Sequence, residues 1–219
     1  QGRGNVITIK SADVTIKDIN LRGSGNNLTR MDSVIFITQN AARAQILNNN
    51  IFSKAFGIWV DGARGVRILG NHIQGDNTIR SQDRGNGVHL FNTTGAEVAD
   101  NDIWHTRDGI YIDTSNHNIL KNNHLHHLRY GIHYMYSHHN QVIGNRTNDT
   151  RTGYALMQSN HLTVINNHSL DDDNYGILLN YIINSSIENN YVTSVSSISD
   201  SEAGIKQAPG IEGKALFVY

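Results

Sequence analysis

A repeat of about 22 residues constrains this chain more than any other feature. An apolar residue, two spacers and an asparagine recur along most of the sequence, with the asparagines at Asn49, Asn71, Asn101, Asn123, Asn145, Asn167 and Asn190. The intervals are 22 or 23 residues except for one of 30, between Asn71 and Asn101. A fixed period of this length is typical of solenoids, because each repeat can bury its apolar side only against its neighbours.

A glycine opens a short alternating segment in each repeat, at Gly57, Gly87, Gly109, Gly131, Gly153 and Gly176. Short strands at a fixed period, separated by Asn, Gly and Ser turns, predict an all-β fold of one domain over residues 1–219. The predicted architecture is a right-handed parallel β-helix with about 22 residues per coil. Stacked coils bring the repeated asparagines together, where their amides can form a hydrogen-bonded ladder. We therefore interpret these asparagines as structural.

Composition excludes several kinds of protein. The net charge of −1 gives no reason to expect binding to nucleic acid. The chain has no cysteine, which rules out disulfides, thiolate metal ligands and a cysteine nucleophile. It has no apolar run long enough to span a membrane. No signal peptide is visible and both ends resemble strands, so we expect a piece of a longer protein.

Strand alternation assigns each side chain to a face. After each glycine, positions one and three are expected to point inward and positions two and four outward. The inward residues are Ile58, Val60, Val88, Leu90, Ile110, Ile112, Ile132, Tyr134, Tyr154, Leu156, Ile177 and Leu179. The outward residues are Trp59, Asp61, His89, Phe91, Tyr111, Asp113, His133, Met135, Ala155, Met157, Leu178 and Asn180.

Two methionines occupy the same outward position on neighbouring coils. Met135 and Met157 should have Cβ atoms ~5 Å apart, and His133 faces the same way two residues before Met135. A further outward histidine, His89, lies two coils earlier. Thioether and imidazole ligands together suit Cu(I). The alternative is that both methionines pack beneath a loop or a partner protein.

A second group of histidines follows the ladder asparagines. His124, His126 and His127 lie close together, and the pair at 138–139 lies beyond the next strand. Histidine-rich tracts can bind metal, but they also occur as solvated turns. The residues alone leave both interpretations open.

An enzymatic role is a further alternative. Parallel β-helices commonly carry polysaccharide lyases, epimerases and hydrolases, and a uronate lyase needs a base together with Ca²⁺ or arginine. Asp61 and Asp113 share an outward column, but the coil of Phe91 separates them, while Asp108 and Arg129 are isolated candidates. Because no compact group of carboxylates forms on adjacent coils, this alternative is weaker.

Extra residues accumulate at one corner of the repeat, in segments 22–30, 74–84 and 194–212. Loops on one side of a repeat protein often form its binding surface. The chain could therefore also be a docking scaffold without a metal site, and tolerated surface insertion is the simplest interpretation.

Several segments resemble the NosD family. The most specific are Ile132-His-Tyr-Met-Tyr136 and Gly153-Tyr-Ala-Leu-Met157, and the resemblance extends over essentially the whole chain. It implies a periplasmic copper-binding protein that is not an enzyme. The implied role is delivery of copper for the copper–sulfur centre of nitrous oxide reductase. The implied partners are an ABC transporter permease and its ATPase, a copper chaperone lipoprotein and the reductase itself.

The resemblance also implies a ligand set. His133, Met135 and Met157 are expected to hold copper as Cu(I), and His89 or His124 would complete the site or receive the ion first. A further methionine is typical of the family at the position of Leu178, so this chain lacks one thioether that similar members have.

Overall fold

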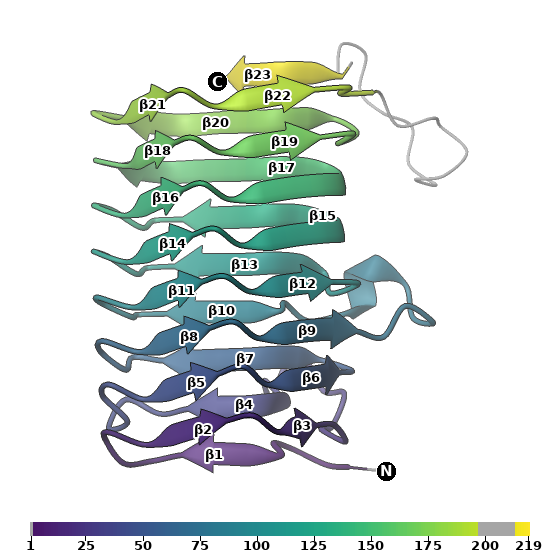
Figure 1. The fold of residues 1–219 in the computed structure, drawn as a ribbon, viewed down its shortest axis with the longest axis vertical. Coiled ribbons are helices and arrows are strands. Elements are labelled where there is room, and N and C mark those ends of the chain that lie inside the picture. Colours follow the sequence, from purple (N-terminus) through teal and green to yellow (C-terminus); the bar gives the residue numbers. More distant parts are fainter. Residues whose placement is uncertain (1, 197–212) are drawn as a thin grey trace.

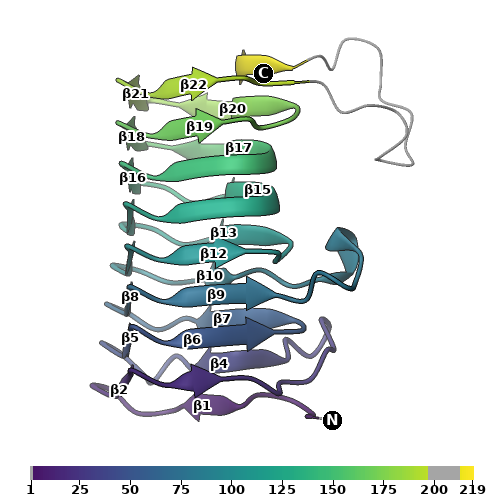
Figure 2. The same cartoon turned by 45° about the vertical axis from the view of Figure 1, so that its right-hand side comes forward.

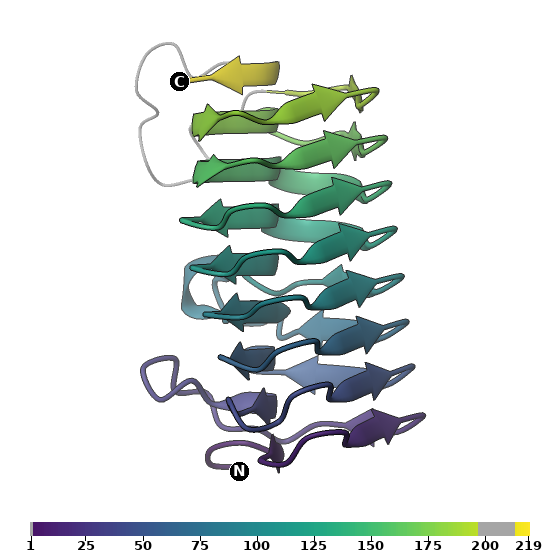
Figure 3. The ribbon, with the colours of Figure 1, turned by 90° about the vertical axis from the view of Figure 1, so that its left-hand side faces the viewer.

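A single stack of parallel strands makes up the molecule. The computed structural model describes residues 2–196 and 213–219, and the chain ascends coil by coil from the N-terminus to the last strand (Figures 1 and 3). Every strand pairing in these two ranges is parallel, which confirms the expected parallel β-helix.

The strands form two sheets. The 8-stranded sheet takes one strand from each successive coil: β2 (Thr15–Lys17), β5 (Gln45–Leu47), β8 (Arg67–Leu69), β11 (Glu97–Ala99), β14 (Ile119–Lys121), β16 (Gln141–Ile143), β18 (Thr163–Ile165) and β21 (Ser186–Glu188). The 15-stranded sheet contains β1 (Ile7–Ile9), β3 (Asn20–Leu21), β4 (Ser33–Ile37), β6 (Asn50–Ser53), β7 (Phe56–Asp61), β9 (His72–Gly75), β10 (Val88–Phe91), β12 (Asp102–Trp104), β13 (Asp108–Asp113), β15 (His124–Met135), β17 (Arg146–Asn160), β19 (His168–Leu170), β20 (Tyr175–Ile183), β22 (Tyr191–Thr193) and β23 (Lys214–Val218).

The core is the column of inward side chains. All twelve residues predicted to point inward are buried, and Tyr134 and Tyr154 are among the largest side chains that are completely enclosed. Burying an aliphatic or aromatic side chain of this size contributes ~1.5–3 kcal/mol, and each coil supplies several. The alternation of inward and outward residues therefore sets the register of the whole stack.

The repeated asparagines form the expected ladder. From Asn49 to Asn167, each side-chain Nδ2 donates to Oδ1 of the asparagine on the next coil, at 2.9–3.0 Å, and Asn190 is the last acceptor. The second Nδ2 hydrogen is donated to a backbone carbonyl, as from Asn123 to Val98 at 2.9 Å. The asparagine side chains therefore supply the hydrogen bonds of the buried turn. This confirms that they are structural.

Some side chains of β7 and β10 point outward from the core and are nevertheless buried. Trp59 and His89 point outward but are only 8% and 6% accessible. Leu28 and Met31, from the segment before β4, pack against the cluster that contains Trp59, and the rings of Trp59 and His89 lie 3.9 Å apart. The first corner insertion therefore covers this part of the outer surface.

The second corner segment contains the one-turn 3₁₀ helix η1 (Ser81–Asp83) and projects between β9 and β10, as Figure 2 shows. Arg84 fastens it, since Nε donates to the Ile79 carbonyl at 2.8 Å and Nη1 to that of His105 at 3.0 Å. The third expected loop, 194–212, lies outside the described residues from position 197 onward. Among the described residues, no helix has the length and apolar character needed to cross a membrane.

Candidate functional site

Two methionines lie side by side on the outer surface. Met135 at the end of β15 is the register partner of Met157 on β17, and both are half-buried. Asp113 precedes them and Asn180 follows them in the same column. Parallel neighbours of this kind are ~4.8 Å apart along the stack, so two thioethers can reach one ion.

His133 lies on the same strand and face, two residues before Met135. Its Nδ1 is 3.0 Å from Oδ2 of Asp108, a carboxylate that is almost completely buried. Because a carboxylate only accepts hydrogen bonds, Nδ1 carries a proton, and in a neutral ring Nε2 then presents its lone pair. A carboxylate bound to one ring nitrogen is the usual means of orienting a metal-binding histidine.

Asp108 is held as an anion by two cationic or donor groups. Arg129 donates Nε and Nη2 to its two oxygens, at 2.8 and 2.6 Å. Burial alone would raise the pKa of Asp108, but the hydrogen bonds from His133 and Arg129 outweigh it and hold that pKa below its usual range. The carboxylate therefore stays ionised at neutral pH and fixes the tautomer of His133.

Aromatic rings hold His133 in place. Tyr111 stacks on its imidazole with ring centroids 4.4 Å apart, and Tyr130 meets it edge-on at 5.1 Å. Burial raises the pKa of Tyr111 to about 12, so this phenol is neutral and serves as a wall.

His89 is separated from the methionine pair. It is the register partner of Tyr111, which in turn pairs with His133, so a tyrosine stands between the two histidines. The Nδ1 of His89 lies 3.1 Å from the Asn86 amide nitrogen. Burial lowers the pKa of His89 to about 3, which leaves the ring neutral.

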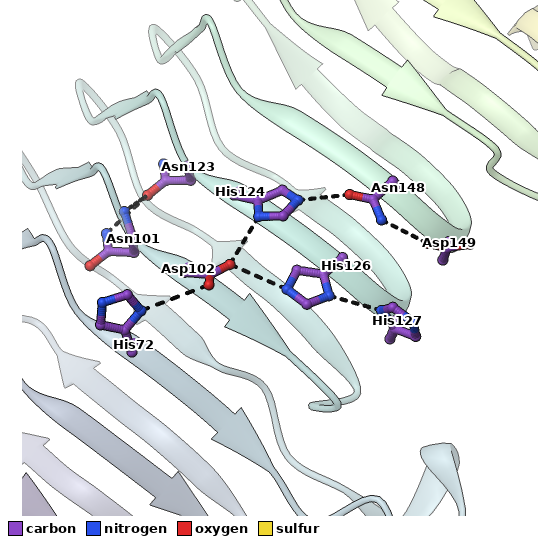
Figure 4. Close-up of polar contacts among 9 residues, drawn as sticks. All are labelled: His72, Asn101, Asp102, Asn123, His124, His126, His127, Asn148 and Asp149. Atoms are coloured by element: carbon purple, nitrogen blue, oxygen red, sulfur yellow. Dashed lines mark hydrogen bonds and ion pairs between the residues drawn. The ribbon is translucent and has the colours of Figure 1, made fainter.

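His124 belongs to a different group. It lies at the start of β15, before the bend that His127 makes with a φ of 55°. Its Nδ1 is 3.0 Å from Oδ1 of Asp102, and the Nε2 of His126 is 3.2 Å from the same oxygen (Figure 4). We call Asp102, His124 and His126 the Asp102 cluster. His133, Met135 and Met157 thus share one face, as expected. His124 instead lies beside a carboxylate and a second imidazole.

Two further findings bear on the sequence interpretation. Position 178, where the resemblance led us to expect a methionine in similar members, pairs with Ala155 and not with Met157. A methionine there would extend the column of His133 and not that of the thioethers. The role of Asp108 was missed, although Arg129 follows it by 21 residues, one short of the period, which places the two on adjacent coils.

Comparisons with known proteins identify relatives of the chain. The family model described as periplasmic copper-binding protein (NosD) matches residues 69–208. Two proteins named "Probable ABC transporter binding protein NosD", from Pseudomonas aeruginosa and Stutzerimonas stutzeri, are 50% identical over 218 and 219 residues, which is 100% of this chain. The chain spans about half the length of these two relatives.

A solved structure resembles the fold. DFA-IIIase from Arthrobacter chlorophenolicus A6 in complex with GF2 aligns with a TM-score of 0.65 at 17% identity, over 85% of this chain and 54% of that one. This likeness shows the parallel β-helix alone. The family match and the two relatives carry the classification, and the chain belongs to the NosD family of periplasmic copper-binding proteins.

Proposed function

We propose that this chain binds Cu(I) in the periplasm and delivers it for assembly of the copper–sulfur centre of nitrous oxide reductase. The family description supports copper, and the names of the two relatives support work with an ABC transporter. The transporter's permease and ATPase, a copper chaperone lipoprotein and the reductase are the partners in this proposal. They follow from the resemblance of the sequence to the family.

The observation that carries the proposal is the pairing of Met135 with Met157 beside an oriented imidazole. Thioether sulfur is a soft ligand and favours Cu(I). In its neutral form His133 would offer Nε2 to the ion, because Asp108 holds Nδ1. In the described part of the chain, no hydrogen-bond partner is found for this Nε2.

His89 and His124 are left out of this ligand set. Tyr111 lies between His89 and His133 in the register, and His124 is directed at Asp102 on the other side of the bend in β15. Three ligands without a thiolate suit a cargo ion, since a partner's sulfur can then replace them one at a time.

We infer an accessory role and no enzymatic one. The buried Asp108 is the carboxylate best placed to act as a base, but both of its oxygens already accept hydrogen bonds from Arg129 and one also contacts His133. A general base needs a free oxygen within reach of a substrate proton. The uronate-enzyme alternative therefore gains no support from this group.

The test is an anaerobic competition titration of the chain with Cu(I). The wild type is expected to bind about one ion. The double variant Met135→Leu/Met157→Leu should bind it at least ~100-fold more weakly while its circular dichroism stays unchanged. The control is Met31→Leu, which alters the third methionine of the chain, located in the cluster around Trp59.

Equal affinity of the wild type and the double variant would contradict the proposed ligands. Absence of Cu(I) binding in the wild type would contradict the function itself for this part of the protein. Deletion of segment 74–84 separates a docking role from the metal role, because loss of transporter binding with copper affinity intact would assign docking to this loop.

A further inference from the structure

We propose that the Asp102 cluster is a second metal site, built for a borderline divalent cation, Zn²⁺ or Cu²⁺, and separate from the thioether pair. Three protein ligands would hold the ion: Nδ1 of His124, Nε2 of His126 and a carboxylate oxygen of Asp102. The inference rests on these residues and stands independently of the proposed Cu(I) site.

The ligand atoms already converge. Nδ1 of His124 lies 3.0 Å and Nε2 of His126 lies 3.2 Å from the same Asp102 oxygen. All the cluster's ligand atoms are within 4.8 Å of one another. Ligands at ~2.0–2.2 Å from a tetrahedral zinc ion lie ~3.3–3.6 Å from each other, so small side-chain shifts suffice to admit the ion.

The hydrogen bonds of His124 direct one ring nitrogen at the Asp102 carboxylate. Asn148 donates its Nδ2 to Asp149 at 2.7 Å, which fixes the amide and turns Oδ1 toward Nε2 of His124, also at 2.7 Å (Figure 4). Nε2 must therefore carry the hydrogen, and in a neutral ring Nδ1 presents a lone pair. That lone pair faces a carboxylate oxygen, an arrangement that repels unless a proton or a metal ion lies between them.

The scaffold holds the ligands in place before any ion binds. Asp102 and His124 each directly follow a ladder asparagine, Asn101 and Asn123, which are themselves hydrogen-bonded at 2.9 Å. His126 stacks on Trp104 with the ring planes 5° apart. Ligands on rigid strands lose little freedom on binding, which favours a site with defined geometry.

The cluster is accessible on one side. The side chains of His124 and Asp102 are 43% and 34% exposed, whereas that of His126 is 18% exposed. His72 contributes a further imidazole at the edge, with Nδ1 3.7 Å from the second Asp102 oxygen, and it lines a groove together with Trp104. The arrangement leaves a fourth position open to water, His72 or an exchanging ligand.

The donor set differs from that of the thioether pair. Two imidazoles and a carboxylate suit Zn²⁺ and Cu²⁺ and offer no soft sulfur for Cu(I). β15 contributes His124 and His126 to the Asp102 cluster and Met135 to the thioether pair, on either side of the bend at His127. The other ligands, Asp102 and Met157, lie on β12 and β17. The two groups thus share one strand and prefer opposite oxidation states of copper.

The test uses the chain without a histidine tag, titrated with Zn²⁺ against a chromophoric competitor and with Cu²⁺ followed by electron paramagnetic resonance. The expected result is one tight ion, with nitrogen hyperfine structure for Cu²⁺. The variants His124→Gln/His126→Gln and Asp102→Asn should each weaken Zn²⁺ at least ~10-fold. The near-isosteric Asp102→Asn keeps the test valid if the double variant fails to fold.

Two controls separate the sites. His168→Gln changes an exposed histidine at the equivalent position two coils away and should leave Zn²⁺ affinity unchanged. Met135→Leu/Met157→Leu should also retain Zn²⁺, and Asp102→Asn should retain Cu(I). The proposal is overturned if the wild type takes up no divalent ion, since a proton then bridges His124 and Asp102. It is equally overturned if the cluster variants bind Zn²⁺ like the wild type, or if Zn²⁺ is lost with the methionines.

Discussion

Among single residues, Asp108 has the most contacts that bear on the proposed copper site. It is buried, accepts both hydrogen bonds from Arg129 and fixes the ring of His133. Alternation of the strand was enough to predict that His133 and the methionines share a face. The function of Asp108 was not predictable from alternation, because Asp108 lies before the glycine from which the alternation is counted and acts on the next coil.

We predict that Asp108→Asn lowers both stability and copper affinity. The substitution leaves the guanidinium of Arg129 partly buried without its charge partner, which typically costs ~3–5 kcal/mol in unfolding free energy. It also releases the tautomer of His133, so Cu(I) affinity should fall ~10–100-fold. Urea unfolding of the metal-free chain and the Cu(I) competition titration measure the two effects.

The control for this substitution is Asp113→Asn, which changes a partly exposed carboxylate next to Met135 in the column. It should alter stability little. Should Asp108→Asn lose stability while keeping full copper affinity, Asp108 is purely structural and His133 is not a ligand.

Among the elements, the strands are too short to hold the fold by themselves, and several have three residues. The asparagine ladder joins them at every turn. Asn123 accepts from the backbone and side chain of Asn101 and donates to Val98 and Asn145, all in a buried setting. A buried donor left without an acceptor costs ~1–3 kcal/mol.

We therefore expect Asn123→Ala to destabilise the fold by ~3–5 kcal/mol, because it leaves two donors of Asn101 unpaired. Asn190→Ala, in the last rung, should cost only ~1 kcal/mol since water can replace the part-buried amide. Chemical denaturation compares the two variants. Equal losses at both positions would mean that the ladder acts through side-chain shape and not through hydrogen bonding.

The repeat of about 22 residues and the alternation of inward and outward side chains along each strand were sufficient to predict the asparagine ladder, the core and the outward columns. The burial of Trp59 was not predictable, because Leu28 and Met31, which pack against its cluster, lie in and directly after the insertion at 22–30, outside the repeat. A second ladder has the same spacing but was not predicted, because its members are serines. The backbone amides of Ser115 and Ser137 donate to the hydroxyls of Ser137 and Ser159, each at 3.0 Å.

At the scale of the whole molecule, two buried carboxylates give opposite responses to pH. Burial raises the pKa of Asp172, even though Ser169, Thr150 and Thr147 donate hydrogen bonds to it. The pKa of Asp108 is lowered despite burial, through His133 and Arg129. Because the pKa of Asp172 is raised in the native state, the native state binds this proton more tightly than the unfolded state does. The stability that Asp172 contributes is therefore lost as pH rises through its pKa in the folded protein.

The lowered pKa of Asp108 has the reverse effect. Its contribution to stability is complete above the unfolded value of ~3.9 and is lost as pH falls through the folded value. We predict that the stability difference between the wild type and Asp108→Asn is constant above about pH 5 and shrinks steadily below pH ~4. Urea unfolding from pH 3 to 7 measures it, and two curves that remain parallel to pH 3 would show that the buried ion pair does not set the acid limit of this fold.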